Sequence, residues 1–199
     1  MPQPIEFFFD FSSPYAYIAS HLIDDLGAKH GRPVVWKPIL LGAMFKLTGM
    51  APLIEFPVKG DYARHDFIRS ARLHGVPFQM PDPFPFSSIH AVRAFYWLAA
   101  TDGQAAHDLA RKLYRAAFGG RPIGDARAVA AIASEMGIDG GALGAGIETQ
   151  DIKDRARAEN DAAIARGVFG APFIIADGEA FWGADRLDQV DRWLTTGGW

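Results

Sequence analysis

The sequence predicts an α/β fold in which the strands lie near the two ends of the chain and helices fill the middle. Three observations predict it. A Phe-rich apolar run covers residues 5–9, prolines interrupt residues 77–85, and an Asp177-Gly178 turn signal separates two late apolar runs. With 199 residues, of which 49% are hydrophobic, the chain is long enough to bury a substantial core, and one domain is the first expectation.

The first element is a buried strand at Ile5–Phe9, because the run is short, apolar and aromatic. Ser13 is then a favourable N-cap and Pro14 a favourable first residue of a helix. This helix is expected to continue to Leu26, and residues 33–39 form the next strand. A strand, a helix and a second strand of these lengths predict a right-handed parallel βαβ unit.

The middle of the chain shows helical spacing and no convincing strand. The four prolines between residues 77 and 85 make that segment irregular. The Gly-rich stretch 137–146 is interpreted as a flexible connection between helices rather than a phosphate-binding loop. The predicted helices cover residues 62–75, 89–100, 105–118, 126–136 and 147–166.

Strands return near the end of the chain. Residues 173–175 and 179–182 flank Asp177-Gly178, a tight-turn signal of the hairpin type, and Asp185 is placed to cap a last helix over 187–194. The order βαβ, helices, ββα is typical of a thioredoxin-like fold with a large all-helical insertion. We expect residues 1–40 and 120–199 to form the thioredoxin-like domain and residues 41–119 to form the helical insertion.

Composition excludes several classes of function. The chain has no cysteine, so it can form neither a disulfide nor a dithiol redox site, and a thiol reaction needs a thiol from outside. Its formal net charge is −3 without a basic tract, which argues against a nucleic-acid partner. The six histidines show no metal-ligand spacing, so no metal is expected. No targeting or membrane-spanning segment is visible, and we expect a cytoplasmic protein.

Three features could carry chemistry, and each also has a purely structural interpretation. Ser13 is either a simple N-cap or a hydroxyl that donates to a bound anion such as a thiolate. Pro172 either starts a strand or is a cis-proline that leaves the backbone of Ala171 free to pair with an extended ligand. Asp185 either caps a helix or holds the α-amino group of a ligand.

A fourth segment combines Lys46, Lys59, Tyr62, Asp66 and Arg69. It is either a solvated helix face or a cationic lip for an acidic substrate.

Several motifs occur together and in order along the chain: Asp10–Tyr17, Lys59–Asp66, Ser87–Arg93, Val168–Phe173 and Phe181–Leu187. This set resembles the 2-hydroxychromene-2-carboxylate isomerase family, which has a DsbA-like thioredoxin fold and is related to the kappa class of glutathione transferases. The resemblance covers essentially the whole chain.

The resemblance implies glutathione as a bound cofactor. It matches Ser13 to the serine that holds the glutathione sulfur, and Ala171 to the residue whose backbone pairs with the cysteinyl unit, just before Pro172. The loop that it matches to the γ-glutamyl end comprises Trp182, Gly183, Ala184 and Asp185. Lys46 is matched to a substrate-contacting lysine, and Lys59 and Tyr62 are further expected substrate contacts.

The implied reaction is cis-trans isomerisation of 2-hydroxychromene-2-carboxylate or a similar unsaturated aromatic 2-oxo acid, by reversible thiolate addition, bond rotation and elimination. The chain departs from the family pattern in two places. Residues 50–54, Met-Ala-Pro-Leu-Ile, lack the expected Asn-Arg pair, and Ser87 stands where relatives often have Asn. Both departures bear on the substrate more than on the cofactor.

Two alternatives remain open at the level of sequence. One is a kappa-type glutathione transferase that conjugates electrophiles, because Ser13 serves both reactions. The other is a non-catalytic peptide-binding thioredoxin-like module that uses the groove beside Pro172. A homodimer is expected from the family resemblance alone.

Overall fold

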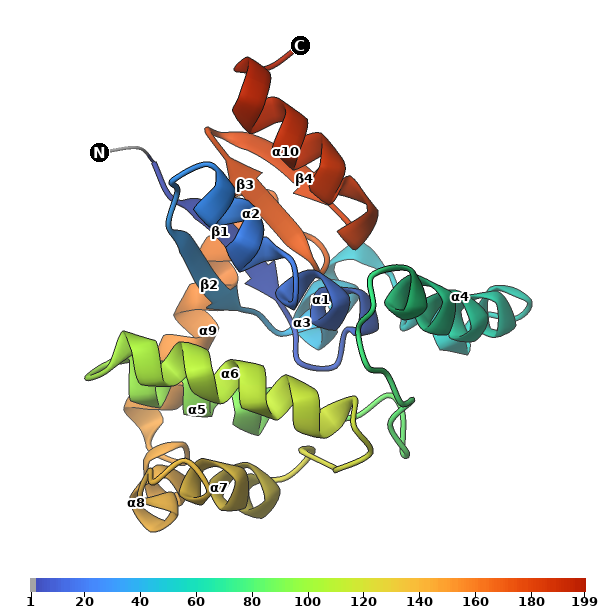
Figure 1. Ribbon diagram of the computed structural model, residues 1–199. Helices are drawn as coiled ribbons and strands as arrows, with labels where there is room; N and C mark the ends of the chain where they lie inside the picture. Colours follow the sequence, from blue (N-terminus) through green and yellow to red (C-terminus); the bar gives the residue numbers. More distant parts are fainter. Residues whose placement is uncertain (1–2) are drawn as a thin grey trace.

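The computed structural model describes residues 3–199 and contains a mixed sheet (Figure 1). Within those residues, four strands are ordered β2-β1-β3-β4 across the sheet. The central strand β1 runs parallel to β2 and antiparallel to β3, and β4 completes a hairpin with β3. The strands are β1 (Ile5–Phe9), β2 (Val34–Pro38), β3 (Phe173–Ala176) and β4 (Glu179–Trp182).

Alternation along β1 divides the core between the two faces of the sheet, as expected of a central strand. Phe7 and Phe9 stack with ring centroids 5.3 Å apart, and both meet the edge of Trp36 at 5.2 Å. Phe8 belongs to a smaller cluster on the opposite face, together with Phe173. The Phe-rich run is therefore the buried strand that the sequence predicts.

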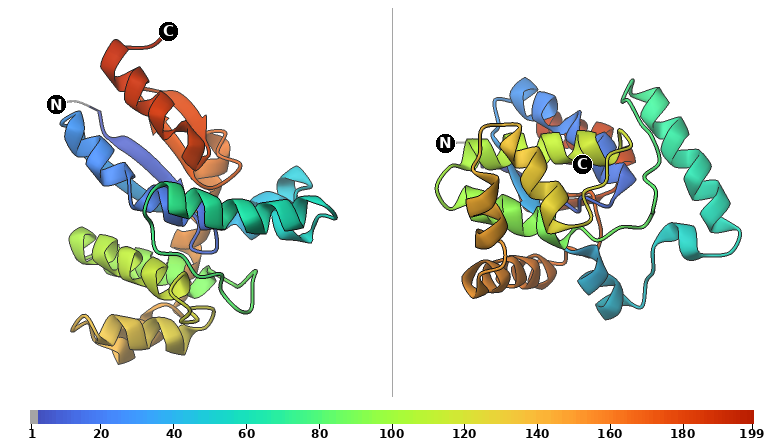
Figure 2. Two further views of the ribbon diagram at one scale, coloured as in Figure 1. Left: turned by 45° about the vertical axis from the view of Figure 1, so that its right-hand side comes forward. Right: turned by 90° about the horizontal axis from the view of Figure 1, so that it is seen from below.

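Helices cover both faces of this sheet. The short helices α1 and α2 and the last helix α10 lie on one face, and α9 lies behind the other (Figures 1 and 2). Helices α5 to α8 are stacked below the sheet, whereas α4 extends to one side. The α-helices are α1 (Pro14–Ser20), α2 (Ile23–Lys29), α3 (Leu41–Thr48), α4 (Lys59–Leu73), α5 (Ile89–Ala99), α6 (Gly103–Ala117), α7 (Ala126–Ser134), α8 (Gly140–Gly146), α9 (Gln150–Ala165) and α10 (Leu187–Thr196).

Several predicted elements are confirmed and others need correction. The predicted single helix from Pro14 to Leu26 is wrong, because the helix ends at Ser20 and a second one begins at Ile23. The expected flexible connection at 137–146 contains the helix α8, whose first amides are bound by the carboxylate of Asp139. Helix α3 was not predicted from the sequence.

The predicted capping role of Asp185 is also wrong. A 3₁₀ turn, η2 (Ala184–Arg186), stands before α10, and neither η2 nor α10 has a side-chain cap. The carboxylate of Asp185 is instead exposed. The predicted division into residues 1–40, 41–119 and 120–199 stays a prediction. Among residues 3–199, no helix is both long enough and apolar enough to cross a membrane.

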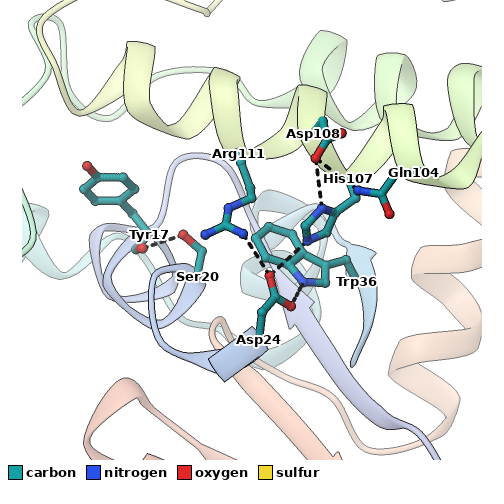
Figure 3. A network of polar contacts seen from close by, with 8 residues as sticks. All are labelled: Tyr17, Ser20, Asp24, Trp36, Gln104, His107, Asp108 and Arg111. Carbon is teal, nitrogen blue, oxygen red and sulfur yellow. Dashed lines mark hydrogen bonds and ion pairs between the residues drawn. The ribbon is translucent and has the colours of Figure 1, made fainter. Parts of the chain in front are cut away.

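A polar cluster ties helices α2 and α6 to strand β2 (Figure 3). Asp24 accepts hydrogen bonds from Trp36 Nε1 at 2.9 Å and from Arg111 at 3.3 Å, and His107 Nε2 lies 3.0 Å from the same carboxylate. The hydrogen bond and charge of Asp24 raise the pKa of His107. Burial of Asp24 opposes its ionisation, but hydrogen bonds from His107 and Trp36 outweigh it and lower the pKa of Asp24.

This cluster predicts a pH-dependent part of the stability. A histidine whose pKa is raised by folding stabilises the fold fully below its ordinary value of 6.5, and that stabilisation is lost as the pH rises through the raised value. We expect His107→Gln to cost about 1 kcal/mol at pH 5.5 and less at pH 8.5. Urea unfolding of both proteins across this range checks the difference, and a gap that widens with pH would contradict it.

Candidate functional site

Ser13 stands at the junction between β1 and α1, as the sequence predicts. It is 6% exposed, and its Oγ accepts a hydrogen bond from the Ala16 amide at 3.2 Å as the N-cap of α1. The same hydroxyl donates to the carbonyl of Ala171 at 3.0 Å, although 158 positions separate the two residues. The Ala171–Pro172 peptide is cis. Of the two interpretations of Pro172, the structure therefore has the cis-proline.

Asp10 fixes the loop that carries Ser13. The Asp10 side chain is buried, and its carboxylate accepts hydrogen bonds from the amide and hydroxyl of Ser12, from the amide of Leu41 and from the hydroxyl of Ser88. Its backbone carbonyl also accepts from the Ser13 amide at 2.9 Å. Burial raises the pKa of Asp10, against the hydrogen bonds, which lower it. Asp10 therefore connects the Ser13 loop with the starts of α3 and α5.

A cavity of about 1030 Å³ opens beside Ser13, and residues of α1, α4 and the loop after β4 line it. Most residues predicted for the site line it, although they come from distant parts of the chain. Those residues are Ser13, Tyr62, Ala171, Pro172, Trp182, Gly183, Ala184 and Asp185. Lys46 and Lys59 do not line this cavity, so the structure does not bring these two predicted substrate contacts to it.

The loop after β4 forms one wall of the cavity. The Gly183 amide donates to the Pro172 carbonyl at 3.0 Å, which joins this loop to the turn before β3. Gly183 has φ 113°, and a β-carbon there would lie 2.3 Å from Asp185 Oδ1. The side chain of Asp185 is 74% exposed, and its ion pair with Arg186 is long, at 3.8 Å. This carboxylate is thus available to a cationic group in the cavity.

Sequence reasoning missed the contact that joins α1 to α4. The hydroxyl of Tyr15, two positions after Ser13, donates to the carboxylate of Asp66, which also accepts from Arg69. Arg69 donates in turn to the hydroxyl of Tyr62 at 2.9 Å. Burial, followed by the hydrogen bond to Asp66, raises the pKa of Tyr15. All four side chains line the cavity, and the helical spacing of Tyr62, Asp66 and Arg69 was the available signal.

We expect Tyr15→Phe to loosen α4 without unfolding the protein. The variant removes the hydrogen bond to an ionised carboxylate, worth about 1.5–3 kcal/mol, but keeps the ring that packs edge-on against Phe67 at 4.9 Å. Hydrogen exchange of the α4 amides should become faster while exchange in β1 stays slow. Unchanged exchange in α4 would show that the contact does not hold this helix.

Another part of the cavity lining is apolar. It is formed by Leu41, Phe45 and residues 50–54, which we call the apolar arm. The arm includes the stretch Met-Ala-Pro-Leu-Ile that departs from the family pattern. The cavity can therefore hold a polar ligand against the loop after β4 and an apolar one against the arm. Among residues 3–199, no group of three or more His, Asp or Glu side chains is placed to hold a metal ion.

Comparison with known proteins agrees with this architecture. A family model described as the DSBA-like thioredoxin domain matches residues 4–195. The chain belongs to this family. The fold class predicted from the sequence, a thioredoxin-like fold with additional helices, is thereby confirmed, together with the predicted family resemblance.

Three similar proteins match nearly the whole chain. The Caenorhabditis elegans protein named glutathione S-transferase kappa 2 is 29% identical, covering 96% of this chain and 91% of its own. The Pseudomonas putida protein named 2-hydroxychromene-2-carboxylate isomerase is 28% identical, covering 94% and 92%. A solved structure of 2-hydroxychromene-2-carboxylate isomerase superposes with a TM-score of 0.84 at 26% identity, covering 96% of this chain and 94% of that one.

Proposed function

We propose that this protein is a glutathione-dependent enzyme, and that its reaction is the cis-trans isomerisation of an unsaturated aromatic compound. One observation carries the proposal: the Ser13 hydroxyl, the Ala171–Pro172 peptide and the exposed Asp185 carboxylate line the same cavity. The relatives named 2-hydroxychromene-2-carboxylate isomerase support the reaction class. The finer prediction is that this protein acts on the substrate after which these relatives are named, or on a similar 2-oxo acid.

The residues present fit glutathione. An extended tripeptide with a thiol and a free α-amino group needs a hydroxyl donor for its sulfur, exposed backbone for its peptide groups and a carboxylate for its ammonium group. Ser13, Ala171 and Asp185 offer these three groups in the lining of one cavity. The Asp185 carboxylate is exposed, and its ion pair with Arg186 is long. The absence of cysteine is no obstacle, because the thiol belongs to the ligand.

Bound glutathione would supply a nucleophilic thiolate, which can add reversibly to a conjugated carbon. The protein's part is to favour that thiolate and to place the substrate beside it. The Ser13 hydroxyl can donate to a negative sulfur instead of to the Ala171 carbonyl, and such a charge-assisted hydrogen bond lowers the pKa of a thiol. The apolar arm packs the aromatic part of the substrate and keeps water from it.

A kappa-type glutathione transferase is the second candidate. It is favoured by the 29% identical relative named glutathione S-transferase kappa 2 and by an apolar arm that can hold many aromatic electrophiles. The same Ser13 and cavity serve both reactions. The two differ in outcome, because a transferase accumulates a stable conjugate whereas an isomerase returns free glutathione.

The deciding experiment titrates glutathione into the purified protein and follows heat and the ultraviolet absorbance of the thiolate together. Binding with a new thiolate signal is expected at physiological glutathione concentrations. Turnover of 2-hydroxychromene-2-carboxylate and of a chloronitroaromatic compound then separates isomerase from transferase. No binding of glutathione would contradict both enzymes and leave the peptide-binding module, which affinity for unfolded chains would support.

A further inference from the structure

The charges that line the cavity differ from those expected for a site that binds an organic acid. Lys46 and Lys59, the cations predicted to receive an acidic substrate, do not line it. The Lys59 ammonium group lies over the ring of Phe56, 5.7 Å from its centroid. The predicted cationic lip is therefore not built from these two lysines.

Two of the three cations that line the cavity already have close carboxylate partners. Lys29 Nζ lies 2.7 Å from Asp191, and Arg69 is bound to Asp66. Arg186 stands in the loop after β4, beside Asp185. The lining carries four aspartates, since Asp188 adds to the three partners, against these three cations. Arg186, whose pair with Asp185 is long, belongs to the loop that we assign to glutathione, so a second substrate that lies against the arm finds no cation there.

The apolar arm gives a carboxylate no compensation either. Leu41, Phe45 and residues 50–54 contribute no charged side chain and no side-chain hydroxyl or amide. A carboxylate placed against this part of the lining would lose water without gaining a hydrogen bond from a side chain, which is costly. An uncharged ring that packs against the arm loses only its contact with water, and losing that contact is favourable.

From this arrangement we infer that the electrophile site takes uncharged aromatic compounds, such as an aryl ketone with a conjugated double bond, in preference to aromatic carboxylates. The inference rests on the proposed function, because it assigns the apolar arm to the second substrate. Within that function it ranks a neutral compound, which undergoes the same reversible addition, above the expected 2-oxo acid as a substrate.

The test compares two ligands of nearly equal shape, 2-naphthamide and 2-naphthoate, on protein saturated with unreactive S-methylglutathione. Titration calorimetry should show the amide binding at least about 10-fold more tightly than the acid. Equal or tighter binding of 2-naphthoate, or failure of both ligands to bind, would overturn the inference. Failure of S-methylglutathione to bind would instead count against the proposed function, because the naphthyl pair can still be compared without it.

A matched pair of variants makes the test independent of the wild-type affinities. Leu53 lines the arm and is 43% exposed, whereas Leu47 is 66% exposed and does not line the cavity. Leu53→Arg should raise the affinity for 2-naphthoate about 10-fold relative to the amide, by supplying the missing cation. Leu47→Arg should leave the ratio unchanged. If the two variants shifted the ratio equally, the arm would not be where the acid is rejected.

Discussion

Replacing Ser13 by alanine is expected to lower glutathione-dependent turnover by roughly 10–150-fold. The reason is the loss of one hydrogen bond to a charged sulfur, worth roughly 1.5–3 kcal/mol. The buried Ser13 hydroxyl donates a hydrogen bond to the Ala171 carbonyl at 3.0 Å, so the position of the hydroxyl is set before any ligand binds. The measurement is the rate at saturating glutathione together with the thiolate absorbance of the complex, and both should fall.

The same substitution also removes an N-cap, so stability must be followed in parallel. Loss of the bond to the Ala16 amide is expected to cost about 1 kcal/mol of unfolding free energy. Ser20→Ala is the matched control, because this buried serine on the same helix bonds only within the helix, to the Tyr17 carbonyl. Full turnover in Ser13→Ala, or an equal loss in Ser20→Ala, would remove Ser13 from its proposed role.

The parts of the fold that the sequence predicts correctly are governed by local interactions. The hairpin between β3 and β4 follows from Asp177 and Gly178, which adopt φ 52° and 84° as a tight hairpin turn requires. Ser13 and Pro14 begin α1 where predicted because capping acts within a few residues. The Phe-rich strand is recognisable because four of its five positions are apolar.

Two features that were not predicted from the sequence are decided by contacts between distant positions. Helix α3 begins where the Leu41 amide bonds to the buried carboxylate of Asp10, 31 positions away. The contact between Tyr15 and Asp66 spans 51 positions. Neither helical periodicity nor capping preference contains this information. For the site, the family motifs bring together Ser13 and Ala171, but only the folded chain shows which lysines lie outside the cavity.

Asp10 illustrates how a residue outside the chemistry can govern the site. Asp10→Ala would leave four donors without their acceptor, among them the Leu41 amide and the buried Ser88 hydroxyl. We expect the unfolding free energy to fall by about 3 kcal/mol. Because the same bonds fix the Ser12–Ser13 loop, glutathione affinity should fall as well under conditions in which the variant is folded.

Asp10→Asn separates the hydrogen bonds from the charge. The amide oxygen can still accept from two of the donors, so we expect a loss of only about 1 kcal/mol.

Burial raises the pKa of Asp10 above its ordinary value of 3.8, so the wild-type protein should lose stability as the pH rises from 3.8 toward the folded-state pKa. The asparagine variant should lack that slope. Urea unfolding of the three proteins between pH 4 and 8 measures both effects. If the asparagine variant were as unstable as the alanine variant at every pH, the ionised carboxylate itself would be what holds the loop.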